Sequence, residues 1–200
     1  MRRIDLNEAA NFLREHDRFL ILMHGSPDGD TVGCGTALCG ALQQIGKLAR
    51  TACPDPLPKK FGYMFRELKE QEFEPETIVA VDVADTKLLY GMREVGEKTQ
   101  LCIDHHVSNT EYAERLLLAP EYAAAAELMF ELLSSMKEVR ITSSIADSLY
   151  TGIATDSGCF KYSNTSPQTH VYAAELIKLG ADIVPINYAT VSYTHLTLPT

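Results

Sequence analysis

The sequence contains no tryptophan, no apolar run of membrane-spanning length and no C-x-x-C pair. A membrane-spanning helix needs about 18 or more consecutive apolar residues, and no stretch approaches that length. The amino-terminal segment Met1–Asp5 becomes polar at once and lacks the apolar core of a signal peptide. The five cysteines are dispersed and odd in number, which is typical of reduced, buried thiols. These absences predict a cytoplasmic protein that does not act in a membrane.

Positive charge is also scarce, because 18 lysines and arginines face 27 aspartates and glutamates and leave a net charge of −9. An acidic chain has no general attraction for long nucleic acid, so an anionic substrate requires bound cations or a local basic patch. The hydrophobic content of 46% is ordinary for a globular protein, and 200 residues suffice for one domain. We therefore expect a globular protein that does not bind long nucleic acid.

Apolar runs that resemble buried strands recur through the first half of the chain. They cover residues 19–23, 48–53, 77–81 and 99–103. Helical patterns lie before or between them, at residues 5–16, in a segment ending near Ile45, and in shorter form within residues 59–74 and 85–89. Strands that alternate with helices predict an α/β fold with a mainly parallel sheet flanked by helices.

From Pro120 onward the sequence predicts a mostly helical second half. The expected helices cover residues 121–136, 143–155, 167–179 and 182–189. Residues 1–190 thus form one expected domain. Residues 191–200 are rich in threonine, contain no acidic or basic residue other than a histidine, and do not resemble a domain ending. We interpret this tail as a truncated or spliced reading frame.

Carboxylates and imidazoles gather where the expected strands and helices end. The candidates are His24, Asp28, Asp30, Asp82, Asp104, His105, His106 and Asp156. Sites in parallel sheets lie beyond the carboxyl ends of the strands, where most of these residues fall. Oxygen and nitrogen ligands without thiolate suit a hard or borderline cation such as Mn²⁺ or Mg²⁺. Several carboxylates in one pocket could not all stay ionised without cations, so we expect two divalent ions that activate a water for attack on phosphorus.

Each motif taken alone also has a structural interpretation. The D-x-D turn at Asp28 and Asp30 is typical of a solvated turn or helix cap, and Asp82 and Asp156 could each act as a cap. Residues 28–32 also match the core of haloacid-dehalogenase-type phosphatases, in which the first aspartate is a nucleophile. A proline interrupts the strand that should precede that motif, and the histidines would have no role. The joint placement of all these groups favours the metal site.

The sequence resembles the DHH phosphoesterases, whose four motifs occur here in the same order within residues 5–190. The resemblance is carried by H-x-x-x-D-x-D at His24–Asp30, by an aspartate that ends a strand at Asp82, by Asp104-His105-His106 and by the T-D-S-G segment around Asp156. The segment 152–165 is similar to the small bacterial and archaeal nanoRNase branch. That branch implies activity on very short oligoribonucleotides, and on 3′-phosphoadenosine 5′-phosphate or linear and cyclic dinucleotides.

The resemblance also implies a role for each matched residue. One Mn²⁺, with Mg²⁺ as the alternative, would be held by His24, Asp28 and Asp82. A second ion would share Asp82 with the first and complete its ligand set with Asp30, His105 and Asp156.

The remaining two matched residues would act on the substrate and on the ligands. His106 would contact the scissile phosphate, and Asp104 would orient the neighbouring imidazoles.

The chain departs from the family pattern at its carboxyl end. The family continues into a second domain, DHHA1, which grips the substrate with a glycine-rich segment and basic residues, and this sequence stops before it. The alternative function is therefore a catalytically silent fragment or a regulatory module that binds metal or nucleotide. Pyrophosphatase or single-strand exonuclease activity is less favoured, since the latter needs an extended basic groove. The expected partners are short RNA, nucleoside bisphosphates or dinucleotides, and a homodimer is compatible with the family.

Overall fold

The fold is built on one parallel β-sheet, as the sequence predicts. The computed structural model describes residues 1–191, and within them a six-stranded sheet has the order β1-β6-β5-β4-β2-β3 with every neighbouring pair parallel. The strands are β1 (Arg2–Arg3), β2 (Phe19–Leu22), β3 (Ala49–Ala52), β4 (Thr77–Val81), β5 (Leu101–Asp104) and β6 (Arg115–Leu118).

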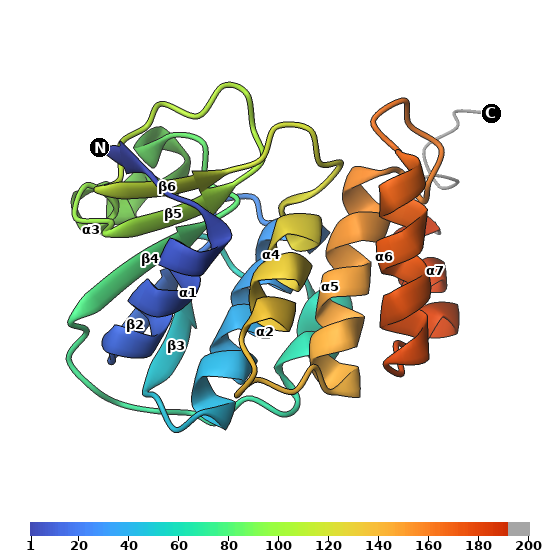
Figure 1. Ribbon diagram of the computed structural model, residues 1–200, viewed down its shortest axis with the longest axis horizontal. Helices are drawn as coiled ribbons and strands as arrows, with labels where there is room; N and C mark the ends of the chain where they lie inside the picture. The colour runs from blue at the N-terminus through green and yellow to red at the C-terminus, as the bar shows by residue number, and fades with distance from the viewer. Residues whose placement is uncertain (192–200) are drawn as a thin grey trace.

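The helices lie mostly on one side of the sheet, in successive layers (Figure 1). They are α1 (Leu6–Glu15), α2 (Gly29–Gln44), α3 (Arg93–Gly96), α4 (Ala125–Ser135), α5 (Ser143–Asp156), α6 (Pro167–Lys178) and α7 (Ile183–Val191), with 3₁₀ segments η1 (Lys59–Phe65) and η2 (Thr86–Met92). Helices α1, α2 and α4 lie nearest the strands, and α5, α6 and α7 lie farther out (Figure 1). The predicted helical second half is confirmed.

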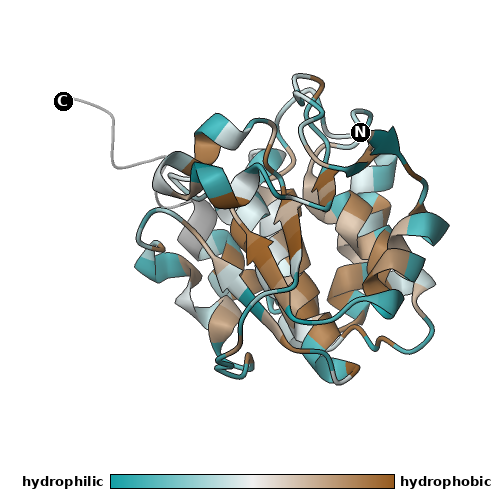
Figure 2. Cartoon of the chain, turned by 90° about the vertical axis from the view of Figure 1, so that its left-hand side faces the viewer, coloured by the Kyte–Doolittle hydropathy of each residue, from teal (hydrophilic) through white to brown (hydrophobic). Residues whose placement is uncertain are grey.

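Two apolar clusters cover the two faces of the sheet. The larger cluster joins alternate residues of the central strands, such as Ile21 and Val79, to the helical layers. The smaller cluster contains Leu22, Ala80 and Leu89, and it is covered by η2 and by the loop before β6. Figure 2 shows the central strands of the sheet as strongly apolar. Because β2, β4 and β5 are buried on both faces, they are continuous apolar runs without alternation.

All four predicted strands are present within two residues of their expected bounds, and several other elements differ from expectation. Strands β1 and β6 are absent from the prediction: β1 is a two-residue edge strand, and β6 is a four-residue strand that lies between β1 and β5. The helix expected within residues 59–74 is only the 3₁₀ segment η1, and α4 begins at Ala125 instead of residue 121. Of the predicted tail at 191–200, residues 192–200 lie outside the described residues.

Helices α2 and α5 pack at unusually close range through two glycines. A Cβ atom on Gly33 would lie 2.3 Å from the carbonyl oxygen of Ser148. A Cβ atom on Gly152 would lie 2.6 Å from both Ala126 Cβ and Asp30 Oδ1. Only glycine allows this approach, which brings the carboxyl end of α5 beside the amino end of α2.

None of the helices in the described part of the chain combines the length and the apolar character that a membrane span needs.

Candidate metal centre

The candidate side chains meet at one edge of the sheet, beyond the carboxyl ends of β2, β4 and β5. They form three overlapping groups whose ligand atoms lie within 4.8 Å of one another: His24–Asp28–Asp82, Asp30–His105–Asp156 and Asp82–His105–His106. The three strands are neighbours in the sheet and run parallel, so the residues that follow them converge. Asp156 reaches the same place from the end of α5.

The turn between β2 and α2 positions the first group. Asp28 is the N-cap of α2, and its Oδ1 accepts hydrogen bonds from the amides of Asp30 (3.0 Å) and Thr31 (3.1 Å). His24 Nδ1 lies 2.8 Å from the carbonyl oxygen of Gly25, which turns Nε2 toward Asp28 Oδ1 at 3.7 Å. The capping interpretation of Asp28 is therefore correct, and it does not prevent Asp28 from facing His24.

Asp30 is fixed by a helix that lies far away in the sequence. Its Oδ2 accepts a hydrogen bond from the amide of Ala125 (2.6 Å), and its Oδ1 accepts one from Ala126 (2.9 Å). The N-cap of α4 is Ala124, which offers no capping side chain, so the carboxylate of Asp30 takes that role at the positive end of the helix. No local sequence signal reveals this contact.

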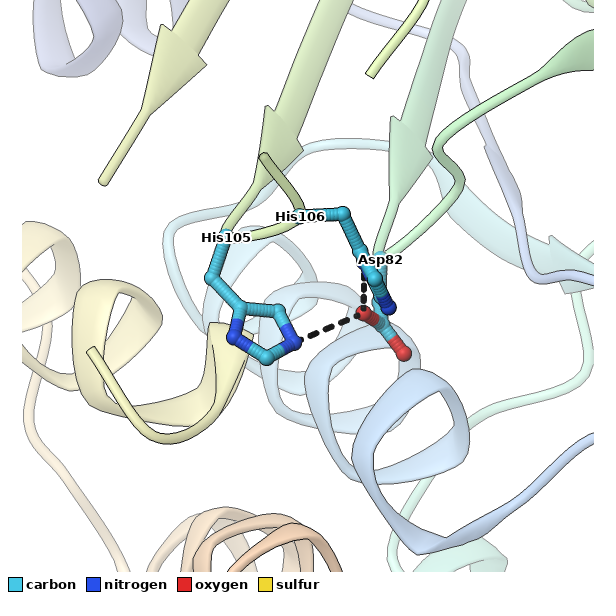
Figure 3. A group of neighbouring side chains, drawn as sticks. All are labelled: Asp82, His105 and His106. Atoms are coloured by element: carbon cyan, nitrogen blue, oxygen red, sulfur yellow. Dashed lines mark ion pairs between the residues drawn. The ribbon is translucent and has the colours of Figure 1, made fainter. Parts of the chain in front are cut away.

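Asp82 is almost completely buried and belongs to two of the three ligand groups. Figure 3 shows its carboxylate facing His105 and His106. Its Oδ2 lies 3.5 Å from His24 Nε2, whereas its Oδ1 lies 3.6 Å from His105 Nε2 and 3.4 Å from His106 Nδ1. Its backbone has φ 56°, a left-handed conformation that aspartate tolerates better than most residues.

The buried atoms at this centre fit a bound cation. Within residues 1–191, Asp82 Oδ1 and His105 Nε2 are buried and have no hydrogen-bond partner. An unpartnered buried carboxylate oxygen costs free energy unless a cation or donor satisfies it. Oxygen and imidazole donors without thiolate suit Mn²⁺ or Mg²⁺, so the donor set and the unpartnered atoms are consistent with the predicted ions.

The two histidines after β5 are held by different partners. Asp104 Oδ1 lies 2.8 Å from His106 Nδ1, and its Oδ2 accepts a hydrogen bond of 2.6 Å from Asn109 Nδ2. The ring of His105 instead has Nδ1 3.1 Å from the carbonyl oxygen of Tyr122. Asp104 therefore orients only one of the two imidazole rings, and the sequence analysis misses Asn109 and Tyr122.

The charges in the cluster perturb one another strongly. Burial raises the pKa of Asp82 to about 6, and the negative charges of Asp28 and Asp156 add to the effect. Burial also raises the pKa of Asp30. Burial opposes protonation of His24 and His105, but the carboxylates around them outweigh it and raise their pKa values to about 11 and about 10. The cluster thus holds protons that a cation would replace.

Proton release on metal binding tests this electrostatic balance. His24 and His105 carry raised pKa values and are protonated at neutral pH, whereas an imidazole ligand must be neutral. Mn²⁺ binding should therefore release about one proton per ion, and the affinity should rise with pH toward the histidine pKa values. Calorimetric titration in two buffers of different ionisation enthalpy measures the released protons. Identical heats in both buffers would contradict the assignment of these histidines as ligands.

The sequence matches a known protein family. Residues 18–153 match the family described as "DHH family, N-terminal domain". The chain is 32% identical over 171 residues to the bifunctional oligoribonuclease and PAP phosphatase NrnA of Thermus thermophilus, covering 83% of this chain and 51% of that protein. It is 31% identical over 191 residues to the NrnA of Mycoplasma genitalium, covering 92% of this chain and 60% of the relative.

A solved structure shares the fold. The exopolyphosphatase-related protein from Bacteroides fragilis superposes with a TM-score of 0.82 at 22% identity, covering 94% of this chain and 60% of that chain. At this identity the likeness concerns the fold alone. The chain spans about half to three fifths of the length of the curated relatives it matches.

Proposed function

This chain belongs to the DHH family, and on that premise we propose that its metal centre serves the hydrolysis of phosphoester bonds. The proposed substrates are short oligoribonucleotides and 3′-phosphoadenosine 5′-phosphate, because the similar proteins bear the name of oligoribonuclease and PAP phosphatase. The proposal includes residues 1–190 as one DHH domain, two Mn²⁺ ions as cofactors and a cytoplasmic location.

The observation that carries this proposal is the position of Asp82 between two ligand groups. Its Oδ2 faces His24, and its Oδ1 faces His105. A carboxylate shared in this way suits a two-ion site, whose ions lie roughly 3.5–4 Å apart. We assign His24, Asp28 and Asp82 to one ion, and Asp30, Asp82, His105 and Asp156 to the other.

Two ions at this site would neutralise a phosphate and lower the pKa of a bound water. The chain's own residues then orient the substrate. His106 is part-exposed, and its Nδ1 is held at 2.8 Å from Asp104 Oδ1, which leaves Nε2 free to meet a phosphate oxygen. Its contact with Asp104 raises the pKa of His106 and so favours the protonated ring, in which Nε2 can donate a hydrogen bond. We propose that His106 contacts the scissile phosphate and Asp104 orients it.

Turnover of a diribonucleotide tests the function. We expect the chain to release mononucleotides from a diribonucleotide, and phosphate from 3′-phosphoadenosine 5′-phosphate, only when Mn²⁺ is present. Chromatography of the products and a phosphate assay measure the two reactions, and metal chelation is the control. Calorimetric binding of Mn²⁺ without turnover of either substrate would contradict the catalytic proposal and would favour a module that only binds metal or nucleotide.

A further inference from the structure

An unusual turn follows the candidate ligand Asp156. Gly158, Cys159 and Phe160 have φ values of 57°, 54° and 63°, so three consecutive residues adopt the left-handed conformation. Residues with a Cβ atom adopt this conformation at a cost in free energy, and they do so rarely in succession. Such strained segments cluster at functional sites, where the surrounding structure holds them in place.

The surrounding contacts hold this turn firmly. The Oγ of Ser157 accepts a hydrogen bond from the amide of Phe160 (3.0 Å), and its carbonyl oxygen accepts one from the amide of Tyr162 (3.0 Å). Asn164 Nδ2 donates to the carbonyl oxygen of Asp156 at 3.1 Å. The ring of Phe160 stacks on His170 with centroids 5.2 Å apart. These hydrogen bonds and the ring stacking hold the turn in its left-handed conformation.

The same turn carries an exposed aromatic residue, Tyr162. A Cβ atom on Gly158 would lie 2.5–2.6 Å from three ring carbons of Tyr162, so one face of the ring rests directly on the glycine backbone. The residue is nevertheless 60% exposed, which leaves its other face open. The turn that carries Tyr162 begins directly after Asp156, which is a member of the second ligand group.

We propose that Tyr162 binds the nucleobase of a nucleotide whose phosphate lies at the metal centre. The inference rests on the proposed function, since it takes the phosphate site from there. Carboxylates, imidazoles and metal ions contact phosphate oxygens and do not distinguish a nucleotide from another phosphate ester. An open aromatic face stacks on any base with little sequence preference, which suits a substrate class defined by short length and not by sequence.

Binding of a matched ligand pair tests this inference. Calorimetric titration of the Mn²⁺-loaded chain with AMP and with ribose 5-phosphate compares ligands that differ only by the base. We expect AMP to bind roughly tenfold more tightly than ribose 5-phosphate. In a Tyr162→Leu variant this difference should disappear while the affinity for ribose 5-phosphate stays unchanged, and Tyr162→Phe should restore the preference for AMP.

Tyr188 provides a matched control. It is 72% exposed on α7 and takes no part in the proposed site, so Tyr188→Leu should keep the preference for AMP. Equal AMP affinity in the unmodified chain and in Tyr162→Leu would overturn the inference and leave the proposed function standing. If the unmodified chain bound neither ligand, the proposed function would fail and this inference with it. Circular dichroism of each variant confirms that it is folded.

Discussion

We expect an Asp82→Asn variant of the proposed enzyme to lose hydrolysis by more than about a hundredfold and to bind fewer than two Mn²⁺ ions. Substitution of a residue that only supports a metal ligand typically lowers metal affinity or activity by about 10- to 100-fold. Asp82 faces both ligand groups directly, so its loss should cost more. Its Oδ2 lies 3.5 Å from His24 Nε2, and its Oδ1 lies 3.6 Å from His105 Nε2. Product analysis and calorimetric counting of bound ions measure the two effects.

The folded state should survive this substitution. Asparagine accepts the left-handed backbone of residue 82 and removes a buried negative charge near Asp28 and Asp156. The melting temperature of the metal-free variant should therefore equal or exceed that of the unmodified chain. Asp182→Asn, at an exposed position, is the control that should leave turnover unchanged. Undiminished hydrolysis by Asp82→Asn would disprove the shared-ligand mechanism.

A single methyl group on Gly152 is expected to weaken the second ligand group. The new Cβ atom would lie 2.6 Å from Asp30 Oδ1 and 2.6 Å from Ala126 Cβ, so Asp30 must leave the amides of α4. We expect Gly152→Ala to lower affinity for one of the two ions at least about tenfold, as loss of a supporting contact does. Overpacking should also lower the free energy of unfolding by about 1–3 kcal/mol. Calorimetry and urea denaturation measure the two changes.

Gly33→Ala is the matched control for that substitution. Its Cβ atom would meet the carbonyl oxygen of Ser148 in the same pair of helices but touches no candidate ligand. It should lower the free energy of unfolding, and it should reduce the ion affinity less than Gly152→Ala does because it does not displace Asp30 directly. Full ion affinity in both variants would show that the contacts of α4 and α5 with Asp30 are not needed for ion binding.

Much of the fold and the position of the site could be predicted from the sequence because their signals are local. The run Thr77–Val81 is continuous and apolar, and it is a strand with the predicted bounds. Asp82 and Asp104 come at the ends of such runs, so parallel pairing alone brings them to one edge. Asp5 and Glu8 likewise form a capping box at the start of α1, and this contact joins residues only three positions apart.

The remaining features depend on contacts between distant parts of the chain. The hydrogen bond from the Ala125 amide to Asp30 joins residues that are far apart in the sequence, and no local pattern predicts it. The strand β6 pairs with β5 on one side and with the two-residue strand β1 on the other, and β1 lies more than a hundred residues away in the sequence. The left-handed turn at Cys159 and Phe160 has no typical sequence, since neither residue favours that conformation.

The contact between Asp30 and α4 also bears on how the chain folds. An ion held by Asp30, His105 and Asp156 would join the first βα unit, the middle of the sheet and the outer helices, which are widely separated in the sequence. Closing loops of that length restricts the unfolded chain most, so the ion would act as a reversible cross-link. Asp30 is held in place by the amides at the start of α4. Binding of an ion at this site would therefore indicate that α4 has packed against α2.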